Sequence, residues 1–250
     1  MFENTYYPQE TLRKALTTSF VWMALGLLVT AATSYLCYST GWYLWMLTSM
    51  PMIGLLLFIV QIGLVFAFQS AMQRSTATGI KVLFMVYAVT FGISLTSLFY
   101  TNSQAQLTAA FLISAVYFIC LAFIGLTTKK NLNSIGMICV IGLTVLIISQ
   151  AVMLLFGVSF DTRMISIVGL LLFTGITAWD IQRMNKILYL SNGDVVSQEK
   201  IAIYMALELY LDFLNIFLYI LRLLGYNRDK RFEECLLLSF LSRRFYEILF

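Results

Sequence analysis

Residues 201–224 read IAIYMALELYLDFLNIFLYILRLL, a nearly continuous apolar run that contains two acidic residues, Glu208 and Asp212. A helix needs about 20 mostly apolar residues to cross a bilayer. At about 1.5 Å per residue, this stretch would extend about 36 Å as a helix, which is enough to span. The stretch therefore predicts a transmembrane helix that carries carboxylates inside the membrane.

Six further stretches of comparable length and composition precede this one. They cover residues 17–38, 51–68, 80–100, 107–126, 135–156 and 164–179. The sixth could continue as a helix towards Leu188, and Pro51 suits the first turn of the second. Short connections favour a single compact bundle. We therefore expect an all-α membrane protein with seven transmembrane helices, forming one membrane domain over residues 1–227. The tail, 228–250, mixes apolar and charged residues, and we expect either an interfacial amphipathic segment or a floppy end.

The composition supports a membrane protein and argues against several other classes. Of the 250 residues 60% are hydrophobic and 11% are charged, whereas soluble domains carry about 25% charged residues. The net charge is +4. In a membrane protein the excess basic residues usually lie in cytoplasmic loops, so this charge does not indicate nucleic-acid binding. The sequence has no histidine, which excludes imidazole metal ligands and Ser-His or Cys-His nucleophiles. The HExxH, GxSxG, P-loop and GxGxxG motifs are also absent. We therefore expect neither enzymatic activity nor a bound cofactor.

The basic residues predict the orientation. With the N-terminus in the cytoplasm, only Arg163 falls outside before the seventh helix, and this asymmetry matches the positive-inside rule. The seventh helix would place Arg222 and the basic residues of the tail outside, so a re-entrant seventh segment remains an alternative, although its length favours crossing. The basic residues on the inside are Arg13, Lys14, Arg74, Lys81, Lys129, Lys130, Arg183, Lys186 and Lys200.

Three acidic residues in apolar stretches, Asp180, Glu208 and Asp212, are the candidate site. A charge near the centre of a transmembrane helix costs about 2.5–3.5 kcal/mol on insertion scales, so each one needs an explanation. Glu208 and Asp212 are four residues apart and share a helix face, and Asp180 on the sixth helix could approach that face. The alternative to a functional site is a satisfied polar contact with no role in transport. This alternative applies above all to Glu208, which could reach water near the interface.

Two carboxylates in a dry pocket cannot easily both ionise, so the pair would share a proton. When protonated the pair can hold two helices together, and when deprotonated it repels itself and attracts cations. Oxygen ligands suit Ca²⁺, so Asp180 and Asp212 are also tentative calcium ligands. Arg74 is more readily a positive-inside anchor than a charge partner for these carboxylates.

Two motifs resemble the Bax inhibitor-1, or transmembrane Bax inhibitor motif, family. GLLLFTGITAWDIQRM (169–184) is similar to its sixth-helix signature and ALELYLDFLNIFLYILRLLG (206–225) to its last helix, while FMVYAVTFGISLTSLF (84–99) fits the third. The resemblance implies six helices around a central C-terminal helix, with Asp180 and Asp212 as the paired aspartates of a pH-sensing latch. Some members carry an arginine in the second-helix region that pairs with these aspartates. The nearest basic residue here is Arg74.

The resemblance also implies a function. It predicts a pH-regulated calcium leak, suppression of cell death in eukaryotic members, and a link to membrane-protein quality control in bacterial ones. The sequence fits a bacterial member, in the inner membrane with its N-terminus in the cytoplasm. We expect membrane lipid and calcium ions as partners. The alternative function is a non-conducting regulator that binds a membrane protease or other membrane proteins.

Overall fold

A computed structural model of the chain describes residues 9–49, 52–156, 162–190 and 195–225. Within these ranges all regular secondary structure is helical. The helices are α1 (Gln9–Ser39), α2 (Trp42–Ser49), α3 (Ile53–Arg74), α4 (Ala77–Leu95), α5 (Ser97–Thr101), α6 (Gln104–Thr127), α7 (Asn133–Phe156), α8 (Thr162–Leu190) and α9 (Val195–Leu224). Pro51 and the tail 228–250 lie outside the described residues.

Among the described residues, seven segments are long and apolar enough to cross a membrane, as the sequence predicts. They are Arg13–Ser39, Ile53–Met72, Ala77–Thr101, Gln104–Thr127, Asn133–Gln150, Arg163–Leu188 and Gln198–Leu224. Most begin or end beyond the predicted apolar runs, because helices continue past the hydrocarbon core into polar sequence. The most consequential extension is α8, which does not stop near Trp179 but continues to Leu190. The last segment is one uninterrupted helix, which favours crossing over a re-entrant turn.

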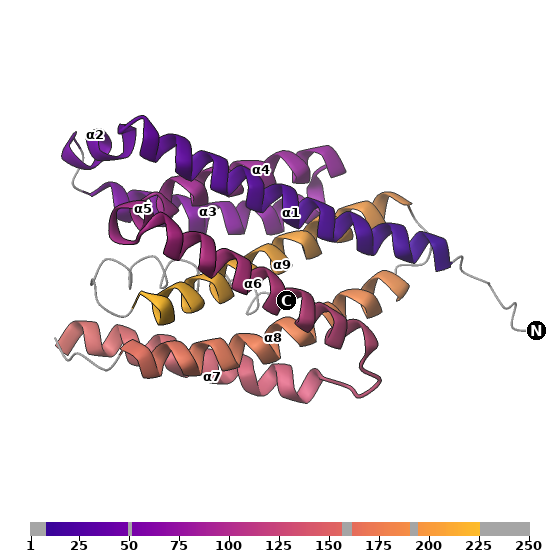
Figure 1. Ribbon diagram of the computed structural model, residues 1–250. Helices are drawn as coiled ribbons and strands as arrows, with labels where there is room; N and C mark the ends of the chain where they lie inside the picture. Colours follow the sequence, from indigo (N-terminus) through magenta and orange to yellow (C-terminus); the bar gives the residue numbers. More distant parts are fainter. Residues whose placement is uncertain (1–8, 50–51, 157–161, 191–194, 226–250) are drawn as a thin grey trace, which may run out of the picture.

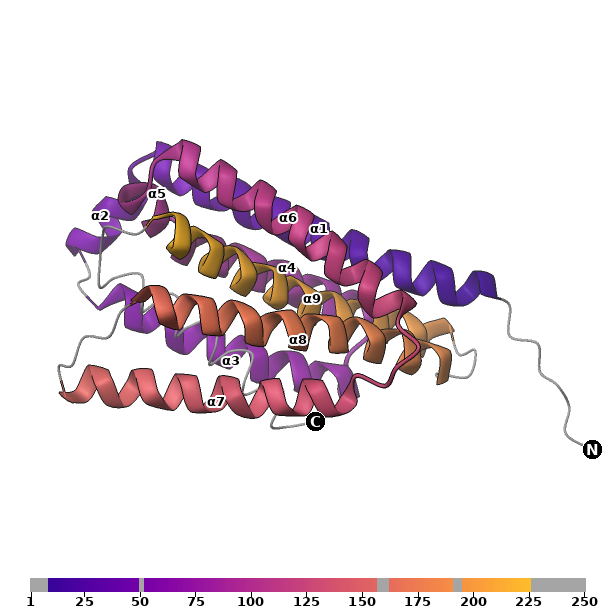
Figure 2. The same cartoon turned by 60° about the horizontal axis from the view of Figure 1, so that its bottom comes forward.

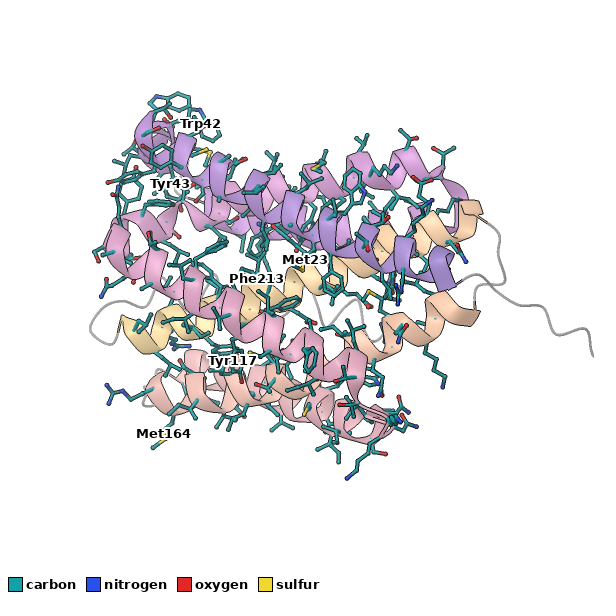
Figure 3. All side chains as sticks on the ribbon, turned by 45° about the vertical axis from the view of Figure 1, so that its right-hand side comes forward. Met23, Trp42, Tyr43, Tyr117, Met164 and Phe213 are labelled. Atoms are coloured by element: carbon teal, nitrogen blue, oxygen red, sulfur yellow. The ribbon has the colours of Figure 1, made fainter. Side chains whose placement is uncertain are left out.

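The short helix α2 was not predicted, because eight residues are too few to span a bilayer. Gly41, at φ +68°, makes the turn between α1 and α2, a conformation that glycine adopts without strain. Aromatic rings then hold this end of the bundle together: Tyr43 stacks on Tyr100 with ring centres 6.0 Å apart, and Tyr38 contacts the same ring. Figure 3 shows Trp42 and Tyr43 together at this end.

The helices run roughly along one common axis, and α9 lies between the others (Figures 1 and 2). It packs against α1, α4, α6 and α8, while α3 packs on α4 and α7 on α8. In its most apolar window 94% of the residues are buried, against 22–50% in the other spans. A helix that is buried all round belongs to the interior of a bundle. The lipid-facing surface is built by large apolar side chains of the other helices, such as Leu112, Ile138 and Leu171.

Small residues bring the helices close together. A β-carbon at Gly92 in α4 would lie 2.7 Å from the carbonyl oxygen of Thr30 in α1. One at Gly125 in α6 would lie 2.8 Å from the carbonyl oxygen of Ala178 in α8. Such backbone contacts are how membrane helices gain packing energy, because burial from lipid supplies little hydrophobic driving force. The acidic residues of α8 and α9 are thus held in a tightly packed frame.

Candidate functional site

All three predicted acidic residues are buried, and they lie on two helices that pack side by side. Asp180 on α8 is 2% exposed, and on α9 Glu208 is 5% and Asp212 0% exposed. Asp212 lies near the middle of the span Gln198–Leu224. Glu208 is as deeply enclosed as the two aspartates, so it does not reach solvent in the way its position near the interface suggested.

Arg183 supplies the cation of this cluster. Its guanidinium Nη2 donates to Glu208 Oε1 in an ion pair between α8 and α9. The same guanidinium interacts electrostatically with Asp180 and lies 5.0 Å from the ring centre of Trp179. The Glu208 side chain is 6% exposed and that of Arg183 25%, so the pair is largely withdrawn from its surroundings. A paired and hydrogen-bonded charge is the form in which proteins tolerate such burial.

The register of the two helices brings Asp180 and Asp212 to the same depth. The chain reverses direction between α8 and α9, so the helices run antiparallel (Figure 2). From the Arg183–Glu208 contact, Asp180 lies three residues back along α8 and Asp212 four residues on along α9. At about 1.5 Å per residue these steps are about 4.5 Å and about 6 Å in the same direction. Spacings of three and four residues also keep each aspartate on the helix face of its neighbour in the ion pair.

Three carboxyl groups, those of Asp180, Glu208 and Asp212, are buried on the helices α8 and α9. Arg183 pairs with Glu208 and interacts electrostatically with Asp180. Like charges in a dry site disfavour one another's ionisation. A proton shared between Asp180 and Asp212 stays a prediction from the sequence.

A buried hydroxyl lies beside this pair. Thr177 is fully buried one turn before Asp180, and its Oγ1 has no hydrogen-bond partner in the described part of the chain. A buried polar atom of this kind is normally satisfied by water. Thr177 thus marks a place beside Asp180 where water would be favourable.

The predicted inner end of α8 is anchored by side-chain hydrogen bonds to the connection between α6 and α7. Gln182 Nε2 donates to the carbonyl oxygens of Thr128 and Lys130, at 3.1 and 2.8 Å, and its Oε1 accepts from the backbone N–H of Leu132. Trp179 Nε1 donates to Asn133 at 3.1 Å. These bonds fix the rotation of α8 on either side of Asp180.

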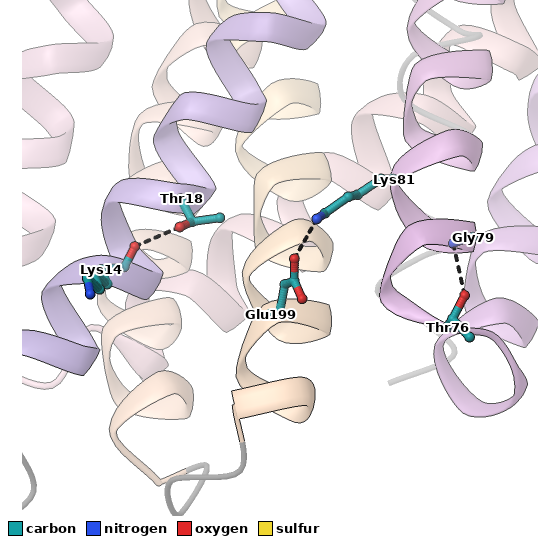
Figure 4. A network of polar contacts seen from close by, with 6 residues as sticks. All are labelled: Lys14, Thr18, Thr76, Gly79, Lys81 and Glu199. Carbon is teal, nitrogen blue, oxygen red and sulfur yellow. Dashed lines mark hydrogen bonds and ion pairs between the residues drawn. The ribbon is translucent and has the colours of Figure 1, made fainter.

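A second ion pair ties α9 to α4 at the same end of the bundle. Lys81 Nζ lies 2.5 Å from Glu199 Oε1 (Figure 4) and 5.6 Å from the ring centre of Trp22 in α1. Arg74, the sequence-based candidate for a charge partner, is exposed at the C-terminal end of α3. The cation that the structure brings to the acidic cluster is Arg183.

On another face of α9, at the depth of the acidic cluster, a hydroxyl network joins α9 to α1 and α4. Thr30 Oγ1 lies 2.6 Å from Tyr210 Oη and donates to the carbonyl oxygen of Ala88 at 3.0 Å. Tyr210 is fully buried two residues before Asp212. This network fixes α9 from the side opposite α8, and sequence alone gave no sign of it because its members lie far apart in the chain.

The predicted calcium ligands, Asp180 and Asp212, are two carboxylates. Among the described residues no group of three or more His, Cys, Asp or Glu side chains is placed to hold a metal ion. Glu208 is turned towards Arg183. Calcium binding by the two aspartates stays a prediction.

Comparisons with known proteins agree with the fold. A family model described as "Inhibitor of apoptosis-promoting Bax1" matches residues 12–229. An uncharacterized protein of Borreliella burgdorferi is 32% identical over 231 residues, which cover 92% of this chain and 100% of that protein. An uncharacterized protein of Deinococcus radiodurans is 33% identical over 220 residues, 88% of this chain and 93% of that protein. The inner membrane protein YbhL of Escherichia coli is 28% identical over 224 residues, 88% of this chain and 95% of its own.

Proposed function

Because the chain belongs to the Bax inhibitor-1 family, we propose that this integral membrane protein is a pH-regulated leak channel for Ca²⁺ and not an enzyme. We place it in a bacterial inner membrane, as YbhL is named, with its N-terminus in the cytoplasm. We also propose that α9 is the central helix of the bundle, with α1, α4, α6 and α8 packed on it and the spans of α3 and α7 completing the surrounding six. The observation that carries the proposal is the burial of three carboxyl groups at the α8–α9 contact, where Glu208 pairs with the partly buried Arg183.

The proton is the switch in this proposal. With one proton between Asp180 and Asp212, the pair carries a single negative charge and a hydrogen bond can join α8 to α9. Gain or loss of that proton changes the charge of a mid-membrane site by a full unit. At low dielectric such a change alters both the helix contact and the attraction for a cation. The permeability to cations then depends on pH through this pair.

The Arg183–Glu208 pair holds the frame in which the switch works. It fixes the depth of α8 against α9 and supplies a positive charge that keeps the site from becoming strongly negative. The hydrogen bonds of Gln182 hold the neighbouring segment of α8. Movement on titration is then confined to the turns that carry Asp180 and Asp212.

Calcium is cargo in this mechanism. Ca²⁺ takes about 6–8 oxygen ligands, and two aspartates supply only part of that shell, with water completing it. A partial shell binds weakly enough to release the ion, which a leak pathway requires. The hydroxyl of Thr177 would help to hold such water beside Asp180.

Calcium flux in proteoliposomes tests the proposal. Full-length protein is reconstituted into vesicles that contain a calcium dye, and the initial rate of influx is measured across a pH series. We expect flux that varies with pH in the wild type. Asp212→Asn removes one titratable group at nearly constant shape, so its pH profile should flatten. Asp180→Asn should do the same, because the two groups titrate as one pair.

Glu199→Gln is the matched control, because Glu199 is an acid of the same helix that lies outside the cluster. Its pH profile should follow that of the wild type. An unchanged profile in Asp212→Asn would remove the aspartate pair from the mechanism. Absence of flux in the wild type, together with recovery of a stoichiometric membrane protease, would favour the non-conducting regulator instead.

A further inference from the structure

A groove opens between α1 and α6 in the half of the bundle away from the N-terminus. Its volume is about 420 Å³, within the range of ligand sites. The floor is formed by Phe213, Leu214 and Phe217 of α9, all buried in the bundle. Figure 3 shows Phe213 between the ribbons of α1 and α6. The groove is separate from the acidic cluster, which α9 directs towards α8.

The groove opens sideways, towards the surface that faces lipid. The rings of Tyr35 on α1 and Phe111 on α6 line it and are 54% and 41% exposed. These residues belong to the apolar belt of a membrane-spanning protein, where the surrounding medium is hydrocarbon chains. The molecules that can enter the groove from this side are therefore membrane lipids.

The polarity of the groove changes along its length. Its outer end is lined by Ser34, Gln104 and Thr108, and its deeper end by Leu27 and Phe111. Ser34 is 3% exposed, and its Oγ has no hydrogen-bond partner among the residues that the structure describes. A buried hydroxyl without a partner is costly in an apolar medium, and a bound acceptor would satisfy it.

The length of the groove fits one leaflet. From Leu27 to Tyr35 it follows α1 for eight residues, which is about 12 Å at 1.5 Å per residue. Half of the hydrocarbon core of a bilayer is about 15 Å thick. With a methylene group comparable in volume to a water molecule, about 30 Å³, the groove holds on the order of ten methylenes.

We propose that this groove binds one acyl chain of a phospholipid from the leaflet opposite the N-terminus, with the ester carbonyl of that chain accepting a hydrogen bond from Ser34. The polar outer end matches the ester and the apolar deeper end matches the chain. Because the chain leaves one hydrocarbon medium for another, binding rests on packing and on this hydrogen bond. The site therefore selects a chain that carries an ester at the right depth.

Photolabelling of the full chain tests this proposal. The protein is reconstituted with a phospholipid whose acyl chain carries a diazirine, irradiated, and digested for mass spectrometry. We expect labelling on the segments 27–35 and 104–111. Ala31→Phe places a ring in the groove and should remove this labelling. Ala32→Phe is the matched control, since Ala32 is also exposed but does not line the groove, and should leave the labelling intact.

Ser34→Ala tests the polar end separately. Loss of one hydrogen bond within a membrane should reduce labelling about threefold, and the reduction should vanish when the lipid is linked by an ether, which has no carbonyl. Thermal unfolding in detergent confirms that each variant folds. The proposal is overturned if Ala31→Phe and Ala32→Phe label equally, because the lipid is then merely annular. It is also overturned if a photoreactive amino acid at Thr108 captures residues 228–250 and not lipid.

Discussion

The ion pair between Arg183 and Glu208 holds two charges where neither would be stable alone. The Glu208 side chain is 6% exposed, so removal of the guanidinium leaves a carboxylate without its main compensating charge. Removing one partner of a buried ion pair lowers the free energy of unfolding far more than replacing both partners. The reason is that the remaining charge stays desolvated without compensation. This asymmetry gives a direct test of how the cluster is held.

We expect Arg183→Gln to lower the free energy of unfolding by on the order of 3 kcal/mol. The double variant Arg183→Gln/Glu208→Gln should recover most of this loss, because no uncompensated charge remains. Unfolding in detergent by titration with a denaturing surfactant measures both. Lys186→Gln, which removes an exposed cation one turn further along α8, should have little effect. Equal losses in the single and the double variant would contradict the pairing.

The hydroxyl contact between Thr30 and Tyr210 should be energetically coupled. Its atoms lie 2.6 Å apart in a fully buried place, and double-mutant cycles in membrane proteins give about 0.6 kcal/mol on average for such bonds, with a maximum near 1.7. We expect a coupling energy in this range from Thr30→Val, Tyr210→Phe and the double variant, measured by the same unfolding titration. Strictly additive losses would show that the two hydroxyls do not bond.

At the level of residues, the sequence identifies the acids but not their cation. Asp180, Glu208 and Asp212 stand out because charge is rare in apolar runs. Arg183 is hidden among the positive-inside residues, because the apolar run of the sixth helix ends near Trp179 and the helix does not. One signal was available: a buried Glu208 demands a cation, and Arg183 lies one turn from Asp180. Only the register of α8 against α9 identifies Arg183 as the cation that pairs with Glu208.

At the level of helices, Gly92 controls how closely α1 approaches α4. A β-carbon there would meet the carbonyl oxygen of Thr30 at 2.7 Å and Cβ of Thr33 at 2.9 Å. Backbone cannot move aside as a flexible side chain can, so Gly92→Ala must separate the two helices. It would also disturb the hydrogen bond of Thr30 to Tyr210 on the same turn.

We expect Gly92→Ala to cost about 1–3 kcal/mol, the usual price of overpacking. Gly63→Ala is the control, because a β-carbon at Gly63 in α3 meets nothing within 4 Å. That change should be neutral or slightly stabilising, since alanine favours helix over glycine by about 1 kcal/mol. The two midpoints of thermal unfolding give the comparison, and a Gly92→Ala variant as stable as Gly63→Ala would mean that the contact is looser than described.

The helix count was predictable and the short elements were not. Seven spans follow from run length and hydropathy, which are local properties of the sequence. The helix α2 depends on contacts instead, because aromatic rings pack it against the end of the bundle. Such features follow from the packing of neighbours, which periodicity does not encode.

At the level of the whole molecule, charge asymmetry and topology make one combined prediction. The C-terminal ends of α3, α6 and α8 lie at the same end of the bundle as the start of α1 (Figure 1). Basic residues such as Lys129 and Lys130 gather at this end, which should face the cytoplasm. The groove then opens into the outer leaflet, and the anchors of α8 lie on the inner side of the acidic cluster.

Cysteine labelling at the two ends of α6 decides this orientation. In a background without the native cysteines, Ala105→Cys and Asn131→Cys place one thiol at each end, both at exposed positions. In intact cells a membrane-impermeant maleimide should modify Ala105→Cys and spare Asn131→Cys, and permeabilisation should make both reactive. The reverse pattern would turn the whole bundle over. The groove would then lie in the inner leaflet. Arg183 would lie on the outer side of the aspartates, so Ca²⁺ that enters from outside would reach Arg183 first. The proposed mechanism would then need the lipid site on the cytoplasmic side.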